Sequence, residues 1–243
     1  MAPSEVNYRA NIRALWLAGC THILATTCCG SLREDYAPGD LVVLDSFIDR
    51  TTKRSQTFHD QASRNQSSDF GAVCHIQMHP SFCPETRKAI MEAAKNADLN
   101  HLLKKTGTIV TVEGPRFSSK AESFMFRSWN ADVLSMTTCP EVVLAKEAGI
   151  SYASIAMVTD YDCWKEGVEA VDAQHVLKVM EANVGNVRKL LIETVKEMST
   201  KDWTDVVKSN KVQFKSRRND FISKSILKPF LFQEIAKNSV ITK

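Results

Sequence analysis

Short apolar segments alternate with amphipathic segments along most of this chain, and this alternation limits the possible folds more than any other feature. The strand-like segments are residues 22–27, 41–44, 108–112, 132–136 and 152–158. The segments with helical spacing are residues 4–17, 84–99, 119–129, 141–147 and 173–198. Such alternation is typical of α/β proteins, in which helices cover a sheet of mainly parallel strands. The sequence therefore predicts a single α/β domain with a largely parallel or mixed central sheet flanked by helices.

Start signals for helices and a polar stretch refine this pattern. Ser4 stands in the N-cap position of the first helix, and Asp172 stands before the last long one. The sequences from Ser119 to Glu122 and from Thr138 to Glu141 have the spacing of capping boxes. Residues 51–72 are polar, so we expect a long surface loop there.

Composition and charge exclude several classes of protein. The 243 residues carry a formal net charge of +3, which is too small to indicate a nucleic-acid partner. No run of 18 uncharged apolar residues occurs, so we expect no contact with a membrane. The seven cysteines lack C-x-x-C pairs, which argues against a disulfide framework and a structural zinc site. We therefore expect a protein of a reducing compartment, cytoplasmic or also nuclear.

The residues that follow the predicted strands are the first candidates for a ligand site. In open α/β sheets, ligands bind beyond the carboxyl ends of the strands. Four polar clusters occupy such positions: Thr26–Ser31, Glu113–Ser118, Met136–Thr138 and Thr159–Asp162. None of them has the pattern of a P-loop, a dinucleotide-binding turn or a hydrolase nucleophile elbow. Those enzyme classes are therefore disfavoured.

Two of the clusters offer groups that suit an anion such as phosphate. Thr27 and its neighbour Cys28 combine a hydroxyl with turn backbone N–H groups. An ordinary transition from strand to turn explains this cluster equally well. Thr138 is the expected helix cap, which leaves Thr137 free for a ligand. A nucleophilic role for the Cys28 thiol is disfavoured because no histidine is close in sequence.

The other two clusters suit a flat heterocycle. Phe117 either belongs to the core or stacks on a ring. Asp160 and Asp162 follow an apolar strand, and strand alternation directs both to the same side. A close pair of carboxylates beside a pocket can raise the pKa of one of them and keep a proton available, although solvated loop carboxylates are common. Hydroxyls, an aromatic ring and acids together indicate nucleoside chemistry.

Seven strings of residues carry a resemblance to a known family. They are residues 6–12, 26–33, 45–52, 113–119, 121–126, 136–148 and 159–166. Over residues 1–207 the sequence resembles the methylthioadenosine phosphorylases of the trimeric purine nucleoside phosphorylase family. The resemblance implies that family's fold and phosphorolysis of methylthioadenosine to adenine and 5-methylthioribose 1-phosphate, a step of purine and methionine salvage. It also implies a homotrimer with inorganic phosphate as co-substrate and no metal or organic cofactor.

For the nucleoside, the resemblance assigns four residues. Asp160 lies on the N7 side of the purine, and Asp162 contacts the exocyclic amine of adenine. Phe117 stacks on the base, and Met136 lies against the sugar. Asp rather than Asn at position 160 favours a 6-aminopurine, so a phosphorylase specific for inosine or guanosine is disfavoured.

For phosphate and for the neighbouring subunit, the resemblance assigns four more. Thr27, Thr137 and the backbone of Cys28 hold the phosphate. His75 reaches from one subunit into the site of another, near the 5′ substituent. A structural histidine at the surface or at an interface is the alternative interpretation of His75.

Two departures from the family pattern lead to further expectations. The family's first strands, a glycine-rich phosphate turn and an Arg-His pair lie upstream of the position where this sequence begins, so the sequence predicts a form that lacks them and has impaired activity. Residues 208–243 do not follow the pattern of the family, in which this region helps to close the pocket, and they predict a divergent basic tail after a phosphorylase domain of residues 1–207. A catalytically inactive variant that binds nucleosides or modulates trimers is the alternative.

Overall fold

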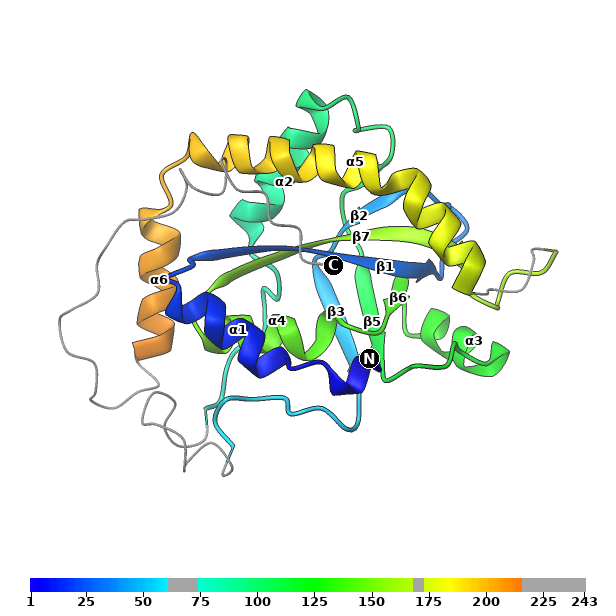
Figure 1. Ribbon diagram of the computed structural model, residues 1–243, viewed down its shortest axis with the longest axis horizontal. Coiled ribbons are helices and arrows are strands. Elements are labelled where there is room, and N and C mark those ends of the chain that lie inside the picture. The colour runs from blue at the N-terminus through cyan, green and yellow to red at the C-terminus, as the bar shows by residue number, and fades with distance from the viewer. Residues whose placement is uncertain (61–73, 168–172, 216–243) are drawn as a thin grey trace.

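The computed structural model describes residues 1–60, 74–167 and 173–215, and in these ranges the chain folds around one sheet of seven strands (Figure 1). In spatial order the strands are β3 (Ser46–Arg50), β5 (Thr108–Val112), β6 (Val133–Ser135), β1 (His22–Ser31), β7 (Ser151–Tyr161), β2 (Leu41–Val43) and β4 (Leu103–Lys104). The pairs β3·β5, β5·β6, β1·β7 and β2·β4 are parallel, whereas β1·β6 and β2·β7 are antiparallel. The predicted α/β fold with a mixed central sheet is confirmed.

Strands β1 and β7 form the centre of the sheet. They run in parallel from His22 opposite Ser151 to Ser31 opposite Tyr161. Nearly all of β7 is buried, which explains the apolar run of this strand, because helices cover both of its faces. The register shifts after Cys29, so that Thr159 is an extra residue on β7.

Helices cover both faces of the sheet (Figure 1). Helices α2 (Pro84–Asn96) and α5 (Ala173–Ser199) pack against each other on one face, and α1 (Tyr8–Leu17) and α4 (Thr138–Glu147) do so on the other. A fifth helix, α3 (Lys120–Ser128), follows β5. None of the helices in the described part of the chain is long and apolar enough to cross a membrane.

Apolar side chains fill the space between these layers and the sheet. Ile12 of α1 and Leu144 of α4 belong to the cluster on one face, and Ile90 of α2 and Leu190 of α5 to that on the other. All four are essentially fully buried. Burial of such a side chain contributes about 1.5–3 kcal/mol relative to exposure. A third cluster, which includes Trp164, supports the carboxyl end of β7.

The last described helix, α6 (Thr204–Lys215), lies at the amino ends of β1 and β7. The ring of Trp203 contacts the ring of His22 edge to face at 4.5 Å, and the Asn210 amide donates to Ser151 Oγ at 2.9 Å. Within this chain α6 is therefore at the end of the sheet opposite to the strand ends that carry the predicted site. The predicted boundary between residues 207 and 208 falls inside α6, and most of the predicted tail lies outside the described residues.

The first helix begins later than predicted. Residues Pro3–Glu5 form a 3-10 turn, and Val6 is extended before α1 starts at Tyr8. Ser4 is therefore not an N-cap, because the turn separates it from the helix. Several other predicted segments agree with the structure to within a few residues, and 108–112 agrees completely. Strands β3 and β4 and helix α6 were not predicted.

Of the two predicted capping boxes, one is confirmed and one is wrong. Ser119 Oγ accepts from the backbone N–H of Glu122, and the Glu122 carboxylate accepts from the backbone N–H of Ser119. In contrast, Thr138 Oγ1 contacts Ser135 Oγ at 3.1 Å, and the Glu141 carboxylate accepts from the Tyr152 hydroxyl at 2.5 Å. The backbone of Cys139 is extended, so no box can close there.

The prediction of a surface loop over residues 51–72 is only partly tested. Residues 51–60 are described, and two of them, Arg54 and Phe58, are buried. This part of the segment is therefore anchored in the protein by these two side chains, while Thr52, Lys53 and Ser55 are exposed at its surface. Residues 61–72 and the predicted cap Asp172 lie outside the described residues.

Candidate active site

Asp160 and Asp162 lie at the carboxyl end of β7 and face the same part of β1. A Cβ atom on Gly30 would lie 3.0 Å from Asp160 Oδ2 and 3.7 Å from Asp162 Cβ, so both side chains are on the side of this glycine. Both acids are buried, with 8% and 4% of their surface exposed. Thr159 Oγ1 donates to Asp160 Oδ1 at 2.7 Å. The sequence prediction that the two carboxylates share one side agrees with this geometry.

The surroundings of Asp162 favour a protonated carboxyl or one that receives further hydrogen bonds. Burial raises the pKa of Asp162, although nearby Ser123, the Cys163 backbone N–H and Ser118 favour the charged form. Asp162 Oδ2 and the hydroxyls of Ser118 and Ser123 are buried without a hydrogen bond of good geometry in the described structure. Buried polar groups rarely stay unsatisfied, so this corner suits a polar ligand edge.

The aromatic and thioether side chains predicted to contact base and sugar lie on two neighbouring loops. Phe117 lies between β5 and α3, and 45% of its surface is exposed, so it is not part of the core. Met136 follows β6 and reaches the preceding loop at Gly114, which has a φ of +67°. A Cβ on Gly114 would lie 2.5 Å from Met136 Sδ. Glycine therefore permits the two loops to approach closely.

The two threonines predicted to bind an anion are brought together by the fold. Thr27 Oγ1 on β1 and Thr137 Oγ1 at the start of α4 are 3.4 Å apart. Thr137 is exposed, and it occupies the N-cap position of α4 without a side-chain capping bond. The prediction that Thr138 is the cap is therefore wrong, but the Thr137 hydroxyl makes no capping bond and lies beside that of Thr27.

Cys28 is half-buried and next to Thr27 on β1. Burial and, less strongly, the charge of Asp160 raise the pKa of the Cys28 thiol. A thiol with a raised pKa is a poor nucleophile at neutral pH. The predicted role of Cys28, a backbone contact with phosphate, does not need the thiolate.

The two ends of this site lie on one strand. Thr27 precedes Gly30 by three residues, and Gly30 is opposite Asp160. Because a strand rises about 3.3 Å per residue, the Cα atoms of Thr27 and Gly30 are separated by about 10 Å along β1, which is the scale of a nucleoside.

His75 is placed apart from these groups. It lies in the segment before α2, and its side chain is exposed. Among the contacts of the described residues, none connects it to the strand ends. Its predicted role concerns a second copy of the chain and stays a prediction. The described residues also contain no group of three or more His, Cys, Asp or Glu that could hold a metal ion.

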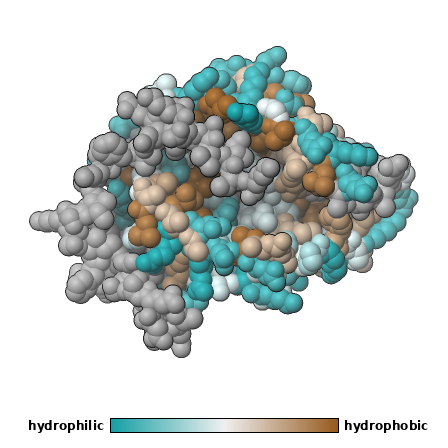
Figure 2. Space-filling view, in the orientation of Figure 1, coloured by the Kyte–Doolittle hydropathy of each residue, from teal (hydrophilic) through white to brown (hydrophobic). Residues whose placement is uncertain are grey.

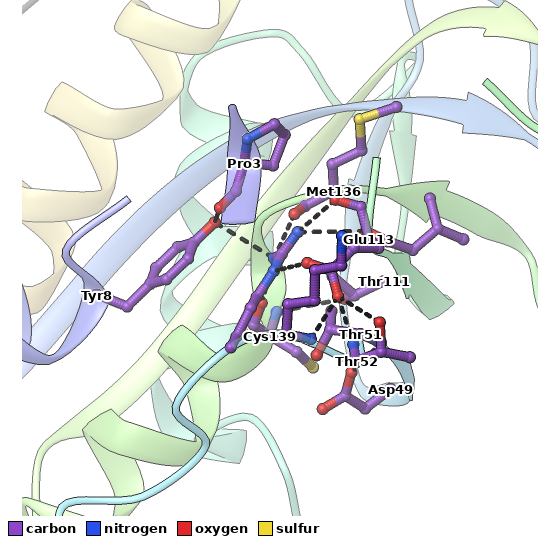
Figure 3. A network of polar contacts seen from close by, with 12 residues as sticks. Pro3, Tyr8, Asp49, Thr51, Thr52, Thr111, Glu113, Met136 and Cys139 are labelled. Atoms are coloured by element: carbon purple, nitrogen blue, oxygen red, sulfur yellow. Dashed lines mark hydrogen bonds and ion pairs between the residues drawn. The ribbon is translucent and has the colours of Figure 1, made fainter. Parts of the chain in front are cut away.

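A buried ion pair beside the site was missed by the sequence analysis. Arg54 Nε donates to Glu113 Oε1 at 3.0 Å, and Glu113 Oε2 accepts from the backbone N–H groups of Thr52 and Lys53 (Figure 3). Burial raises the pKa of Glu113, but these backbone hydrogen bonds and Arg54 outweigh it and bring the value to about 2. The only sequence signal was Arg54 in a polar stretch, and that composition indicates a surface loop instead.

Comparison with known proteins identifies the class to which this fold and site belong. The model of the phosphorylase superfamily matches residues 1–196. S-methyl-5′-thioadenosine phosphorylase of Xenopus tropicalis is 54% identical over 211 residues, which are 87% of this chain and 73% of that protein. The fold and the matched residues thus define a phosphorylase.

Solved structures agree with this result. Methylthioadenosine phosphorylase from Schistosoma mansoni in complex with adenine is 43% identical, with a TM-score of 0.83 over 90% of this chain and 80% of that one. A mutant of the Schistosoma mansoni enzyme in complex with methylthioadenosine has the same identity and a TM-score of 0.80, over 90% and 78%. This chain belongs to the family of S-methyl-5′-thioadenosine phosphorylases.

Proposed function

We propose that the chain catalyses phosphorolysis of S-methyl-5′-thioadenosine to adenine and 5-methylthioribose 1-phosphate, with inorganic phosphate as co-substrate. The observation that carries this proposal is the arrangement along β1. Thr27, whose hydroxyl is 3.4 Å from that of Thr137, lies on β1 three residues before Gly30, which the two buried carboxylates face. One end suits phosphate, and the other suits the edge of a purine.

At the base end, the two acids have separate tasks. Cleavage of the N-glycosidic bond leaves negative charge on the purine, so a proton or hydrogen bond at N7 makes the base a better leaving group. Asp160 acts at N7, and Asp162 accepts from the exocyclic amine. Phe117 stacks on the ring from the exposed loop before α3.

At the other end, phosphate is both nucleophile and counterion. As the bond to the base breaks, positive charge develops on the ribose ring, and a bound phosphate dianion stabilises it. The hydroxyls of Thr27 and Thr137 and the backbone N–H of Cys28 donate to the phosphate. Met136 packs against the sugar between the two ends.

The test is adenine release from methylthioadenosine by this chain, with and without phosphate. We expect phosphate-dependent release that falls about 100-fold or more in Asp160→Ala, the scale of a lost general acid. Asp205→Asn, an exposed position in the first turn of α6, is the matched control and should leave the rate unchanged. Release without phosphate, or release that survives Asp160→Ala, would contradict the mechanism. Adenine binding without any turnover would identify the chain as an inactive nucleoside-binding variant.

We also propose that the chain forms a homotrimer. Apolar side chains stand exposed on α3, directly after it and on α5, among them Phe124, Trp129, Leu177 and Val184. Hydrophobic residues also gather along the middle of the face in Figure 2. Exposed apolar patches often mark protein interfaces. Native mass spectrometry should give three times the monomer mass of 27.2 kDa, and a stable monomer would contradict the proposal.

The location of the chain in the cell is proposed as cytoplasmic and also nuclear. The support is the set of seven free cysteines, which fits a reducing compartment, together with the basic charge of residues 201–243. Fluorescence microscopy of the tagged chain tests it. A signal confined to an organelle of the secretory route would contradict it.

A further inference from the structure

One buried guanidinium joins the two loops that form the sugar and phosphate part of the site. The side chain of Arg54 is 1% exposed. Its Nη1 donates to the carbonyl oxygens of Met136 at 2.5 Å and Cys139 at 2.7 Å, and its Nη2 donates to that of Glu113 at 2.8 Å. Tyr8, Glu113, Met136 and Cys139 surround the same point in Figure 3.

The carbonyls of Met136, just before α4, and of Cys139, in its first turn, lie on either side of Thr137 along the chain. This residue lies in the turn 136–139, which we call the threonine turn, and it carries one of the two hydroxyls of the anion site. Other side-chain bonds to the threonine turn are neutral: Thr111 Oγ1 accepts from Cys139 N at 3.3 Å, and Ser135 contacts Thr138 at 3.1 Å. Bonds to a charged donor are roughly twice as strong as neutral ones. Arg54 is therefore the strongest tie between the threonine turn and the end of β5.

The loop that carries Phe117 has an ion pair of its own. Arg116 donates to both oxygens of Glu122, at 2.8 and 2.7 Å, and Glu122 also closes the capping box with Ser119. The acids at the base end come from β7 and make no described contact with Arg54. The two acids are thus held independently of the threonine turn, whereas Phe117 belongs to the loop whose first residue, Glu113, binds Arg54.

We propose that Arg54 is a positioning residue for the phosphate end of the site, because it fixes the threonine turn against β5 and keeps the Thr137 hydroxyl beside Thr27. Glu113 in turn orients Arg54 and holds the backbone of residues 52 and 53 that leads to it. The identity of the anion as phosphate rests on the proposed function. The geometric role of Arg54 does not.

Two ion pairs of the same chemical type allow a matched test. Arg54→Lys removes the guanidinium, whose several N–H groups reach both loops. Glu113→Gln removes the negative charge that orients the Arg54 side chain. Glu122→Gln is the corresponding change at the base end. Backbone hydrogen exchange is followed for residues 136–140, 114–119 and 152–160, and calorimetry measures phosphate and adenine binding to the full chain.

In Arg54→Lys we expect faster exchange at 136–140, with 152–160 unchanged. Phosphate affinity should fall about tenfold and adenine affinity less than about threefold, because the lost hydrogen bonds concern one end of the site only. In Glu113→Gln, phosphate affinity should again fall more than adenine affinity, but both losses should be smaller than in Arg54→Lys. Glu122→Gln should show the reverse, with adenine binding weakened more than phosphate binding.

A merely structural role for Arg54 gives a different result. Equal losses for both ligands, together with faster exchange over the whole chain, would overturn the proposal. If Arg54→Lys does not fold, Glu113→Gln decides by the same asymmetry. If the unmodified chain binds neither phosphate nor adenine, the proposed function fails. The role of Arg54 is then tested by hydrogen exchange alone, and an unchanged exchange rate at 136–140 in either variant would overturn its positioning role.

Discussion

Gly30 and Asp160 are in contact across the central strand pair, where a Cβ on Gly30 would lie 3.0 Å from Asp160 Oδ2. Contacts of a real Cβ this short are rare, so a side chain at position 30 displaces the carboxylate by a few tenths of an ångström. The backbone of β1 at Gly30 thus packs directly against the two acids. Glycine at this position leaves room for their side chains.

Gly30→Ala should therefore weaken the base end of the site. We expect kcat/KM for methylthioadenosine to fall about tenfold, since small misplacements of a reacting group cost factors of this order or more. Steady-state kinetics checks this, with the melting temperature as the control for folding. A variant with unchanged kcat/KM would mean that Asp160 does not act at its present position.

Gly114→Ala should affect the sugar instead. A Cβ at position 114 would lie 2.5 Å from Met136 Sδ, and its φ of +67° is unfavourable for alanine. Met136 must then rotate away, and the Glu113–Phe117 loop becomes strained by about 1 kcal/mol or more. Adenine affinity measured by calorimetry should change less than the KM for methylthioadenosine. A larger change in adenine affinity would argue against contact between Met136 and the sugar.

The docking of α6 should depend on pH through His22. Burial lowers the pKa of His22 to about 4, from an ordinary value of 6.5. The unfolded chain then binds more protons than the folded one between these values, so stability is lost as the pH falls from 6.5 towards 4, by about 1–3 kcal/mol. Urea unfolding at a series of pH values checks this. His22→Phe keeps a ring against Trp203 but has no group that titrates. In this variant the loss of stability between pH 6.5 and pH 4 should be smaller by about 1–3 kcal/mol.

Gly185 offers a stabilising substitution away from the site. It lies exposed within α5, and a Cβ there would meet no atom within 4 Å. Gly185→Ala should raise the free energy of unfolding by about 0.5–1 kcal/mol, because glycine is a poor helix former. Denaturant unfolding measures the gain, and kcat/KM should stay unchanged. A loss of stability would indicate that this face of α5 contacts another copy of the chain.

Local patterns predicted the fold well where neighbouring residues decide the structure. The capping box at Ser119 depends only on residues 119–122, and it forms as predicted. The same spacing at Thr138 failed, because Tyr152 from β7 takes the Glu141 carboxylate and Arg54 holds the Cys139 carbonyl. Tertiary partners of this kind leave no trace in a window of four residues.

The sequence also predicted part of the candidate site, but not the arginine beside it. Strand alternation placed Asp160 and Asp162 on one side, whereas a shared site for Thr27 and Thr137 was expected from the family resemblance. The turn predicted after Thr27 is wrong, because β1 continues to Ser31. Arg54 could not be found, since it lies in a polar segment and reaches its partners over 46 to 85 residues. Its burial results from the packing of β5 and α4, which no local pattern encodes.

The single extra residue at Thr159 decides which side chains of β7 face Gly30 at the carboxyl end of the strand. Up to Cys29, each residue of β1 has its partner in strict order, and a regular ladder would place Thr159 opposite Gly30. Asp160 and Asp162 would then point to the opposite face of the sheet, because side chains alternate along a strand. Deletion of Thr159 would instead place Asp160 directly after Val158, so that Asp160 would stay opposite Gly30 in a ladder without the extra residue. The face of the sheet on which the two acids lie thus depends on the bulge that accommodates Thr159 as much as on the positions of the acids in the sequence.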